Sequence, residues 1–240
     1  MKLKDKVTIV TGGASGMGAA TVRAFAAAGS IVTLVDLNEK DAFRVAGETG
    51  AAAVIGDVSD SDFCNRTIDD VMTTRGRVDI LVNCAGIILR ANANGTADED
   101  WRRLLAVNVD AVFYMCRAFL PVMRYGGSIV NISSAAAHRG AKDHSAYAAS
   151  KAAVLAFSRS LALEIAPGLR CNAISPGMIE TEMLDVLPND VLESLKQQSP
   201  FNRLGEPREI AEAIGFLCSQ NSSFVTAETL HVNGAGYIAS

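Results

Sequence analysis

The sequence has no excess of basic residues and no cluster of cysteines or histidines. Lys and Arg number 22 against 26 Asp and Glu, and no basic face or tail is visible, which argues against nucleic acid or an anionic membrane as a partner. The three histidines form no ligand-spaced cluster, so we expect no metal site. The five scattered cysteines include no CxxC pair and indicate reduced core thiols: Cys64, Cys84, Cys116, Cys171 and Cys218.

Long apolar segments are also missing. Met1 leads directly into the charged stretch Lys2-Leu3-Lys4-Asp5-Lys6, with no apolar region of a signal peptide behind it. No apolar run reaches the length needed to span a membrane. We therefore expect a cytoplasmic protein. Its 240 residues, 49% of them hydrophobic, suit one globular domain over residues 1–240 with a large core.

Short β-branched runs alternate with helical runs along the chain. Strands are expected at residues 7–11, 31–35, 52–55, 79–82, 128–132, 170–174 and 228–232. Helices are expected at residues 17–28, 39–48, 61–74 (with Ser61 as the cap), 98 to about 124 (bent or ended by Pro121), 146–166 and 207–219. This alternation predicts an α/β fold, a Rossmann-like doubly wound parallel sheet of about seven strands with helices on both faces.

A glycine-rich turn, Thr11-Gly-Gly-Ala-Ser-Gly-Met-Gly18, separates the first predicted strand from the first predicted helix. Glycines there let the backbone approach a pyrophosphate, and the helix that follows offers free N–H groups. A tight turn without a ligand is the alternative. No GK[ST] follows, which excludes the phosphate loop of nucleotide hydrolases. We expect a dinucleotide site with contacts from Gly12, Ser15, Gly16, Met17 and Gly18.

Asp36 ends the second predicted strand, where a carboxylate can accept hydrogen bonds from an adenosine ribose. The same carboxylate would repel a 2′-phosphate. No Arg or Lys stands in the glycine-rich turn or directly after Asp36, and Lys40 is the nearest. A solvated strand-end Asp is the alternative. The sequence therefore predicts NAD as cofactor, with NADP less favoured.

Two further strand ends carry residues suited to a cofactor. Asp57 and Val58 follow the third predicted strand, where an adenine could lie. Asn83, Cys84, Ala85 and Gly86 follow the fourth. The asparagine can tie neighbouring strands together, and the small residues after it leave room for a cofactor.

Tyr147 and Lys151 stand four residues apart in a predicted helix, so they share one helix face. A nearby ammonium group favours the phenolate and lowers the pKa of a tyrosine from its usual value of about 10. A tyrosine of that kind can transfer a proton near neutral pH. An exposed pair without a role is the usual explanation of a lone YxxxK, but the motifs above favour a functional one.

Together these motifs resemble the short-chain dehydrogenase/reductase family over about residues 6–236, in its compact, single-domain form. Thr11, Gly12, Gly16 and Gly18 match the cofactor turn, and Asp57 matches the adenine-contacting acid. The N-N-A-G segment is matched except that Cys84 replaces its second Asn. Asn108 and Ser134 fall at the helix asparagine and the catalytic serine. Near the C-terminus, Ala227, Glu228 and Asn233 depart from the family's T-G-Q-x-L-x-V-D-G. The P-G-x-x-x-T segment implies nicotinamide-side contacts from Pro176, Gly177, Ile179 and Thr181.

The resemblance also implies roles. Tyr147 would be the general acid in ketone reduction and the base in alcohol oxidation. Lys151 would lower its pKa and hold the nicotinamide ribose, and Ser134 would polarise the substrate oxygen. Asn108 would hold a water that links Lys151 to solvent, and Ser133 is a competing serine that should point the other way. A homotetramer is implied, with the helices at 98–124 and 146–166 at one interface.

Residues 87–96, 135–145 and the long segment 178–200 should border the substrate. Within 135–145, solvated-loop roles are favoured over substrate contacts for His138, Arg139, Lys142 and His144. Three functions stay open. The first is an NAD-dependent dehydrogenase of a secondary alcohol. The second is a 3-oxoacyl-thioester reductase of the acyl-carrier-protein type; such relatives usually take NADPH, so Asp36 counts against it. The third is a non-catalytic dinucleotide-binding regulator, against which the complete set of four catalytic-type residues argues.

Overall fold

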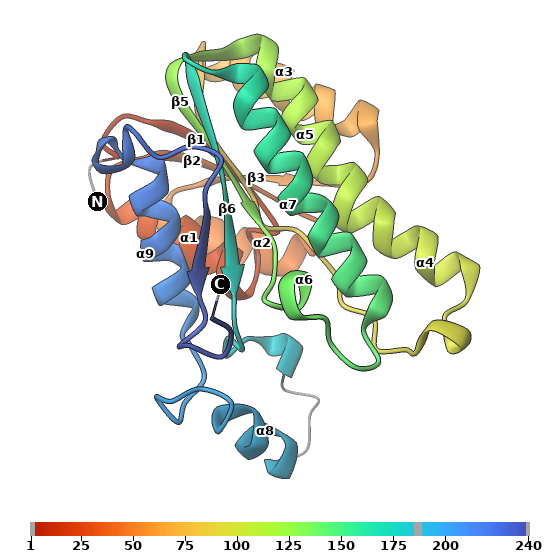
Figure 1. Ribbon diagram of the computed structural model, residues 1–240. Coiled ribbons are helices and arrows are strands. Elements are labelled where there is room, and N and C mark those ends of the chain that lie inside the picture. The colour runs from red at the N-terminus through yellow and green to blue at the C-terminus, as the bar shows by residue number, and fades with distance from the viewer. Residues whose placement is uncertain (1–2, 185–188, 239–240) are drawn as a thin grey trace.

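Seven parallel strands form one sheet in the order β3-β2-β1-β4-β5-β6-β7. The computed structural model describes residues 3–184 and 189–238. The strands are β1 (Val7–Thr11), β2 (Ile31–Asp36), β3 (Ala52–Ile55), β4 (Val78–Asn83), β5 (Met123–Ile132), β6 (Leu169–Pro176) and β7 (Thr229–Val232). The strand order reverses between β1 and β4, which leaves a crevice at the carboxyl ends of the strands. The predicted fold class is confirmed (Figure 1).

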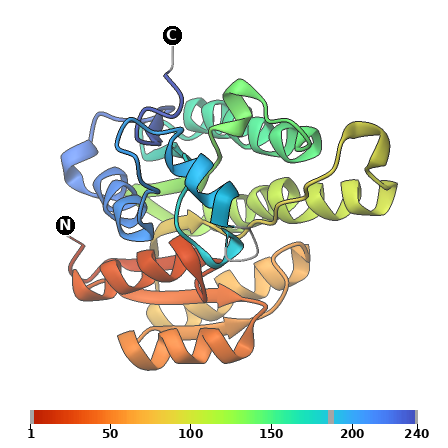
Figure 2. The same cartoon turned by 90° about the horizontal axis from the view of Figure 1, so that it is seen from below.

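Helices cover both faces of the sheet (Figures 1 and 2). One layer packs around a core shared by α1 (Gly16–Ala27), α2 (Glu39–Thr49) and α9 (Pro207–Cys218). The other packs around a core shared by α3 (Ser61–Arg75), α5 (Ala111–Phe119) and α7 (Ser145–Ile165). In β1, Val10 belongs to the first core and Ile9 to the second. Both faces of β1 and β4 are buried, so every residue of these strands is buried, including the polar Thr8, Asp79 and Asn83.

The predicted helix at 98–124 is interrupted and ends early. α4 (Asp98–Leu105) passes into a π-helical turn (Ala106–Asp110), then into α5 and a 3-10 turn (Leu120–Val122). Pro121 lies in that last turn, and a proline cannot continue an α-helix. β5 then begins at Met123, five residues before the predicted strand at 128, so Arg124 is a strand residue. The predicted cap of α3 was also one residue off, since the side chain of Asp60 accepts from the Asp62 N–H.

The combined helix Asp98–Val122 has 25 residues and is long and apolar enough, by length and composition alone, to cross a membrane. The expectation that no run reaches this length is therefore wrong by that measure. Val112, Met115 and Phe119 on this helix are fully or nearly fully buried in the core shared with α3 and α7. Core helices pass the same test, and the packing identifies this one as a core helix.

Short elements surround the carboxyl ends of the strands. α6 (Ala136–Arg139) and α8 (Asn189–Lys196), with 3-10 turns at Ala93–Gly95 and Glu182–Leu184, were not predicted. A further unpredicted 3-10 turn at Gln220–Ser222 lies at the opposite end of the sheet, where Ser222 accepts from Arg170 near the start of β6. α8 lies beyond the strand ends in Figure 1 and in front of them in Figure 2. It occupies the segment 178–200 that was expected to border the substrate. Residues 185–188 of that segment, including Val186 and Leu187, lie outside the described residues.

Candidate active site

A cavity of about 690 Å³ opens at the carboxyl ends of the strands. The loops after β1 to β6 all contribute to its wall, as expected at the reversal point of a doubly wound sheet. Every residue predicted to contact a cofactor lines it, apart from Asn83: Gly12, Ser15, Gly16, Met17, Gly18, Asp36, Asp57, Val58, Ala85, Gly86, Tyr147, Lys151, Pro176, Gly177, Ile179 and Thr181. We call this cavity the main cleft.

The glycine-rich turn closes tightly on itself. A Cβ on Gly18 would stand 1.9 Å from the carbonyl oxygen of Gly12, so only glycine fits there. Thr11 Oγ1 accepts from the N–H groups of Cys84 and Ala85 at 3.1 and 3.2 Å, which joins this turn to the one after β4. Ser15, at the start of α1, provides no side-chain cap. The first residues of α1, Gly16, Met17 and Gly18, line the cleft, and the uncapped N–H groups of a helix N-terminus favour an anion such as a pyrophosphate.

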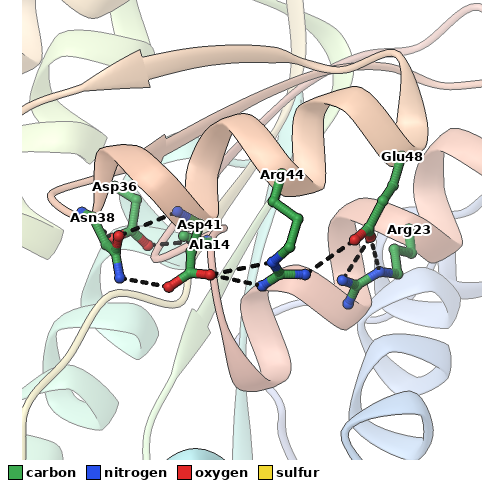
Figure 3. Close-up of polar contacts among 7 residues, drawn as sticks. All are labelled: Ala14, Arg23, Asp36, Asn38, Asp41, Arg44 and Glu48. Carbon is green, nitrogen blue, oxygen red and sulfur yellow. Dashed lines mark hydrogen bonds and ion pairs between the residues drawn. The ribbon is translucent and has the colours of Figure 1, made fainter.

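Backbone N–H groups hold the Asp36 carboxylate at the end of β2. Ala14 N donates to Oδ2 at 3.0 Å and Asn38 N to Oδ1 at 2.9 Å (Figure 3). The carboxylate lines the main cleft beside Leu37. It is therefore fixed in the place where an adenosine ribose would bind, and the residues fit a dinucleotide.

Carboxylates engage both arginines drawn along α1 and α2 in Figure 3. On α2, Arg44 lies between Asp41 and Glu48 at 3.1 and 3.0 Å. On α1, Arg23 contacts Glu48 at 2.7 Å. A 2′-phosphate would have to compete with these carboxylates for either guanidinium group.

Tyr147 and Lys151 lie on α7 and both line the main cleft. Ser134, just past β5, lines the cleft with them, and its side chain is near enough to lower the pKa of Tyr147. The Lys151 ammonium is 5% exposed and donates to the carbonyl of Ile132 at 3.0 Å. The competing Ser133 donates to the backbone carbonyl of Lys151 at 2.8 Å, so its hydroxyl is already engaged. The expectation that it points the other way assumed that both serines belong to the strand, but β5 ends at Ile132. The structure thus brings the three predicted groups Ser134, Tyr147 and Lys151 together.

Burial decides the pKa values of this pair. It raises the pKa of Tyr147, and the nearby Ser134 side chain works in the opposite direction. Burial also lowers the pKa of Lys151 to about 8. The sequence predicted a lowered tyrosine pKa from the Tyr–Lys spacing, and the direction found is the reverse. The reason is that loss of water penalises the charged form of each group.

Asn108 lies in the π-helical turn and is fully buried. Its Oδ1 accepts from Ile87 N at 2.8 Å, and its Nδ2 donates to Ile87 O at 2.9 Å and to Ser150 Oγ at 3.0 Å. The turn supplies the local reason for an asparagine inside a helix, since π turns are frequent at functional sites. A Cβ on Gly86 would lie 3.1 Å from Lys151 Nζ and 3.2 Å from Asn108 Oδ1, so both polar groups border that glycine.

Asn83 belongs to a buried polar chain outside the cleft lining. Its Nδ2 donates to Asn131 Oδ1 at 2.8 Å, and Asn131 Nδ2 donates to Ser158 Oγ on α7 at 2.9 Å. The predicted tie between neighbouring strands is confirmed, and no direct place beside a cofactor is seen. These hydrogen bonds fix the position of α7, which carries Tyr147 and Lys151, on the sheet.

The loop residues divide into two groups. Arg139 and His144 line the main cleft, whereas Lys142 and Asp143 do not. His138 stacks on Tyr237 with ring centres 5.1 Å apart and also contacts His231. Ile88 and Glu182, in the segments 87–96 and 178–200 predicted to border the substrate, line the cleft. Arg103, Ala106 and Val107 of α4 and the π-helical turn also line it and were not predicted, because only their position on the long helix could have indicated them.

Comparison with known proteins places this site in a family. Residues 12–237 match the family described as enoyl-(acyl carrier protein) reductase. The chain is 36% identical to the 3-oxoacyl-[acyl-carrier-protein] reductase FabG of Thermotoga maritima, with 98% of each chain covered. It is 35% identical to FabG of Escherichia coli K12, with 99% of this chain and 100% of that protein covered. The chain belongs to the short-chain dehydrogenase/reductase family.

Solved structures of family members superpose closely on it. A Brucella melitensis protein described as short-chain dehydrogenase/reductase SDR:glucose/ribitol dehydrogenase shares 38% identity with a TM-score of 0.97, covering 99% of both chains. Ligand-free aldohexose dehydrogenase of Thermoplasma acidophilum shares 33% identity with a TM-score of 0.92, covering 99% of this chain and 96% of that one. The protein is thus an oxidoreductase that acts on CH–OH groups with a dinucleotide cofactor.

The tight turn yields a first prediction. Gly18→Ala places a methyl group against the Gly12 carbonyl, so the turn must open, and affinity for NADH and NADPH should fall at least about tenfold, or 1.4 kcal/mol. Gly47→Ala is the matched control, because a Cβ on Gly47 of α2 meets nothing within 4 Å. It should keep the affinity and gain about 0.5–1 kcal/mol of stability. Nicotinamide fluorescence measures binding. Unchanged affinity in Gly18→Ala would contradict the prediction that the glycine-rich turn binds the cofactor.

The buried lysine yields a second prediction. Its pKa is about 8 in the folded chain and 10.5 unfolded, so the unfolded chain binds more protons between these values. The free energy of unfolding should therefore rise with pH across this window, by about 2 kcal/mol from pH 7.5 to 9.5. Urea titrations of wild type and Lys151→Met test this as a difference. Parallel pH profiles for the two proteins would show that Lys151 is charged when folded.

Proposed function

We propose that the protein is an NAD(H)-dependent dehydrogenase that interconverts a secondary alcohol and a ketone. The observation that carries this proposal is that the two hydroxyl side chains Tyr147 and Ser134 and the buried Lys151 line the same cleft, with the Lys151 ammonium held on the carbonyl of Ile132. When bound, the nicotinamide supplies or accepts the hydride. The protein's own side chains then have to bind the substrate oxygen and move one proton.

Each side chain has a distinct task in this proposal. Ser134 donates a hydrogen bond to the substrate oxygen and stabilises the charge that develops on it. Tyr147 gives its phenolic proton to that oxygen in reduction and takes it back in oxidation. Lys151, with its pKa lowered to about 8, can exchange a proton with the phenol in the neutral range. The ammonium also favours the phenolate whenever Tyr147 has lost its proton.

Asn108 supports the proton path. Gly86 has no side chain, which leaves open the space that Lys151 Nζ and Asn108 Oδ1 both border. A water in this space would accept from the ammonium and donate to the amide oxygen, whose second lone pair is available. Such a water would connect Lys151 toward solvent.

The choice of NAD rests on Asp36. Its carboxylate is held on two backbone N–H groups and cannot turn away without losing both. Ribose hydroxyl groups can donate to it, whereas a 2′-phosphate would meet a like charge. Arg23 and Arg44 are already engaged by carboxylates.

Reduction of 3-oxoacyl thioesters is the second candidate, because two relatives at 35–36% identity carry that name. The solved relatives named as sugar or polyol dehydrogenases favour the first candidate. Assays of a 3-oxoacyl thioester, a polyol and a cyclic alcohol with both cofactors discriminate between them. A non-catalytic regulator would need neither Tyr147 nor Ser134 at the cleft.

A homotetramer in the cytoplasm is proposed on the family resemblance. Trp101 and Phe113 are 41% and 43% exposed on the long helix, and Phe113 packs edge-on against Phe157 of α7. These aromatic side chains would be covered if the two helices met a second copy. Light scattering should give about four times the chain mass. A mass near 25.2 kDa at micromolar concentration would exclude the assembly.

Tyr147→Phe tests the proposed chemistry. The ring stays and one hydroxyl is lost, so folding and cofactor affinity should be retained while kcat falls about 10² to 10⁴-fold. Tyr125→Phe is the control, since Tyr125 is 85% exposed and lies outside the cleft lining. It should keep full activity. Near-normal kcat for Tyr147→Phe on the true substrate would mean that another group transfers the proton.

Cofactor choice is tested by titration. Wild type should bind NADH at least about tenfold more tightly than NADPH, a difference of 1.4 kcal/mol. Asp36→Ala combined with Leu37→Arg should narrow or reverse the ratio, because Leu37 is exposed beside the cleft and the new cation can pair with the phosphate. Leu37→Arg alone separates the two effects. Equal or tighter NADPH binding by wild type refutes the proposal.

A further inference from the structure

Two cavities meet beside α6. The second, of about 360 Å³, lies between the segment after α8, the start of α9 and the residues that follow β7. Both cavities are lined by five residues in common: Ala135, Arg139, Gly177, Met178 and Ile179. Of these five, Arg139 alone is charged. A substrate that extends from the main cleft toward the second cavity would therefore pass a guanidinium group.

The position of Arg139 is set by its neighbours in sequence and space. It is the last residue of α6, which begins two residues after Ser134. Its Nη1 donates to Gly236 O at 3.1 Å and its Nη2 to Gln198 Oε1 at 3.4 Å. Both acceptors are neutral. A guanidinium group has five N–H donors, so most of them stay available at the junction.

Among the residues described, the carboxylates that line the two cavities make no ion pair with Arg139, and some are paired with other residues. Asp36 and Asp57 follow β2 and β3 at the predicted adenosine end. Glu182 follows Thr181, which borders Gly16 of the glycine-rich turn, and makes no ion pair with Arg139. In the second cavity, Glu209 pairs with Arg203 at 2.7 Å. Among residues 3–184 and 189–238, none forms an ion pair with Arg139, so its charge is not neutralised there.

We propose that Arg139 is a specificity-determining residue that binds an anionic group, a carboxylate or a phosphate, carried by the substrate away from its reacting carbon. The inference rests on the proposed function and narrows its substrate to a charged secondary alcohol or ketone. The planar guanidinium fork matches the two oxygens of either anion. Neutral polyols and neutral thioesters lack the group that would use it.

Matched pairs of ketones test the inference. The carboxylate arm uses 3-oxobutanoate, 4-oxopentanoate and 5-oxohexanoate, each against its methyl ester, which keeps the shape and removes the charge. The phosphate arm uses dihydroxyacetone phosphate against dihydroxyacetone, and the N-acetylcysteamine thioester of 3-oxobutanoate represents neutral thioesters. In at least one pair the charged member should have a kcat/KM about tenfold or more above the neutral one. The arm in which this occurs identifies the anion.

Variants assign the discrimination to Arg139. Arg139→Gln should raise KM for the charged ketone about tenfold or more and change the neutral partner less than about threefold. Arg139→Lys should restore part of the loss, because the charge returns without the fork. Arg208→Gln is the control for net charge, since Arg208 lies on α9 outside both cavity linings. It should leave the preference unchanged.

The outcomes separate the inference from the proposed function. If wild type reduces the ketones, Tyr147→Phe abolishes this turnover, and no pair shows a preference for the charged member, the proposed function stands and the inference about Arg139 is overturned. Equal losses on both members of a pair in Arg139→Gln overturn it too. If no ketone is reduced, calorimetric titration of the same pairs into NADH-loaded protein decides. Tighter binding of the anion, lost in Arg139→Gln, supports the inference, and equal or absent binding overturns it.

Discussion

The contact between α7 and the end of β5 holds the site together. Lys151 sends its ammonium to the carbonyl of Ile132, and Ser133 sends its hydroxyl to the carbonyl of Lys151. Each element thus donates to the other within one helical turn. An ammonium buried this deeply is tolerated only with a polar partner, because loss of water penalises its charge. Tyr147, one turn earlier on α7, lines the same cleft as Ser134, which follows β5.

A second set of buried hydrogen bonds joins α7 to strands β4 and β5 of the sheet. Asn83 at the end of β4, Asn131 in β5 and Ser158 in α7 are linked by hydrogen bonds of 2.8 and 2.9 Å. Buried amides are costly when unpaired, so the three groups constrain how α7 lies on the sheet. The strand β5, which leads into Ser134, and the helix α7, which carries Tyr147 and Lys151, therefore have few alternative packings.

The sequence was sufficient to predict the structure where one strong local signal determines it. Both faces of β1 and β4 are buried, and their β-branched and aliphatic residues indicate strands, while Gly18 is required by a turn that admits no Cβ. The sequence was insufficient where packing between residues distant in sequence determines the local structure. The π-helical turn around Asn108, the short helices α6 and α8, and the early start of β5 depend on contacts distant in sequence. The pKa of Tyr147 was predicted in the wrong direction, because helical spacing shows a neighbouring charge but not the depth of burial.

The π-helical turn also fixes the phase of the long helix. A π turn accommodates one residue more than regular α-helical winding, and each residue turns an α-helix by about 100°. Without that extra residue, everything from α5 onward would rotate by about this angle relative to α4. Met115 and Phe119, which now fill the core against the sheet, would swing toward its margin. The packing of the core on one face of the sheet and the position of the Asn108 amide therefore both depend on the π-helical turn. A one-residue deletion between Ala106 and Asp110 would disturb both at once.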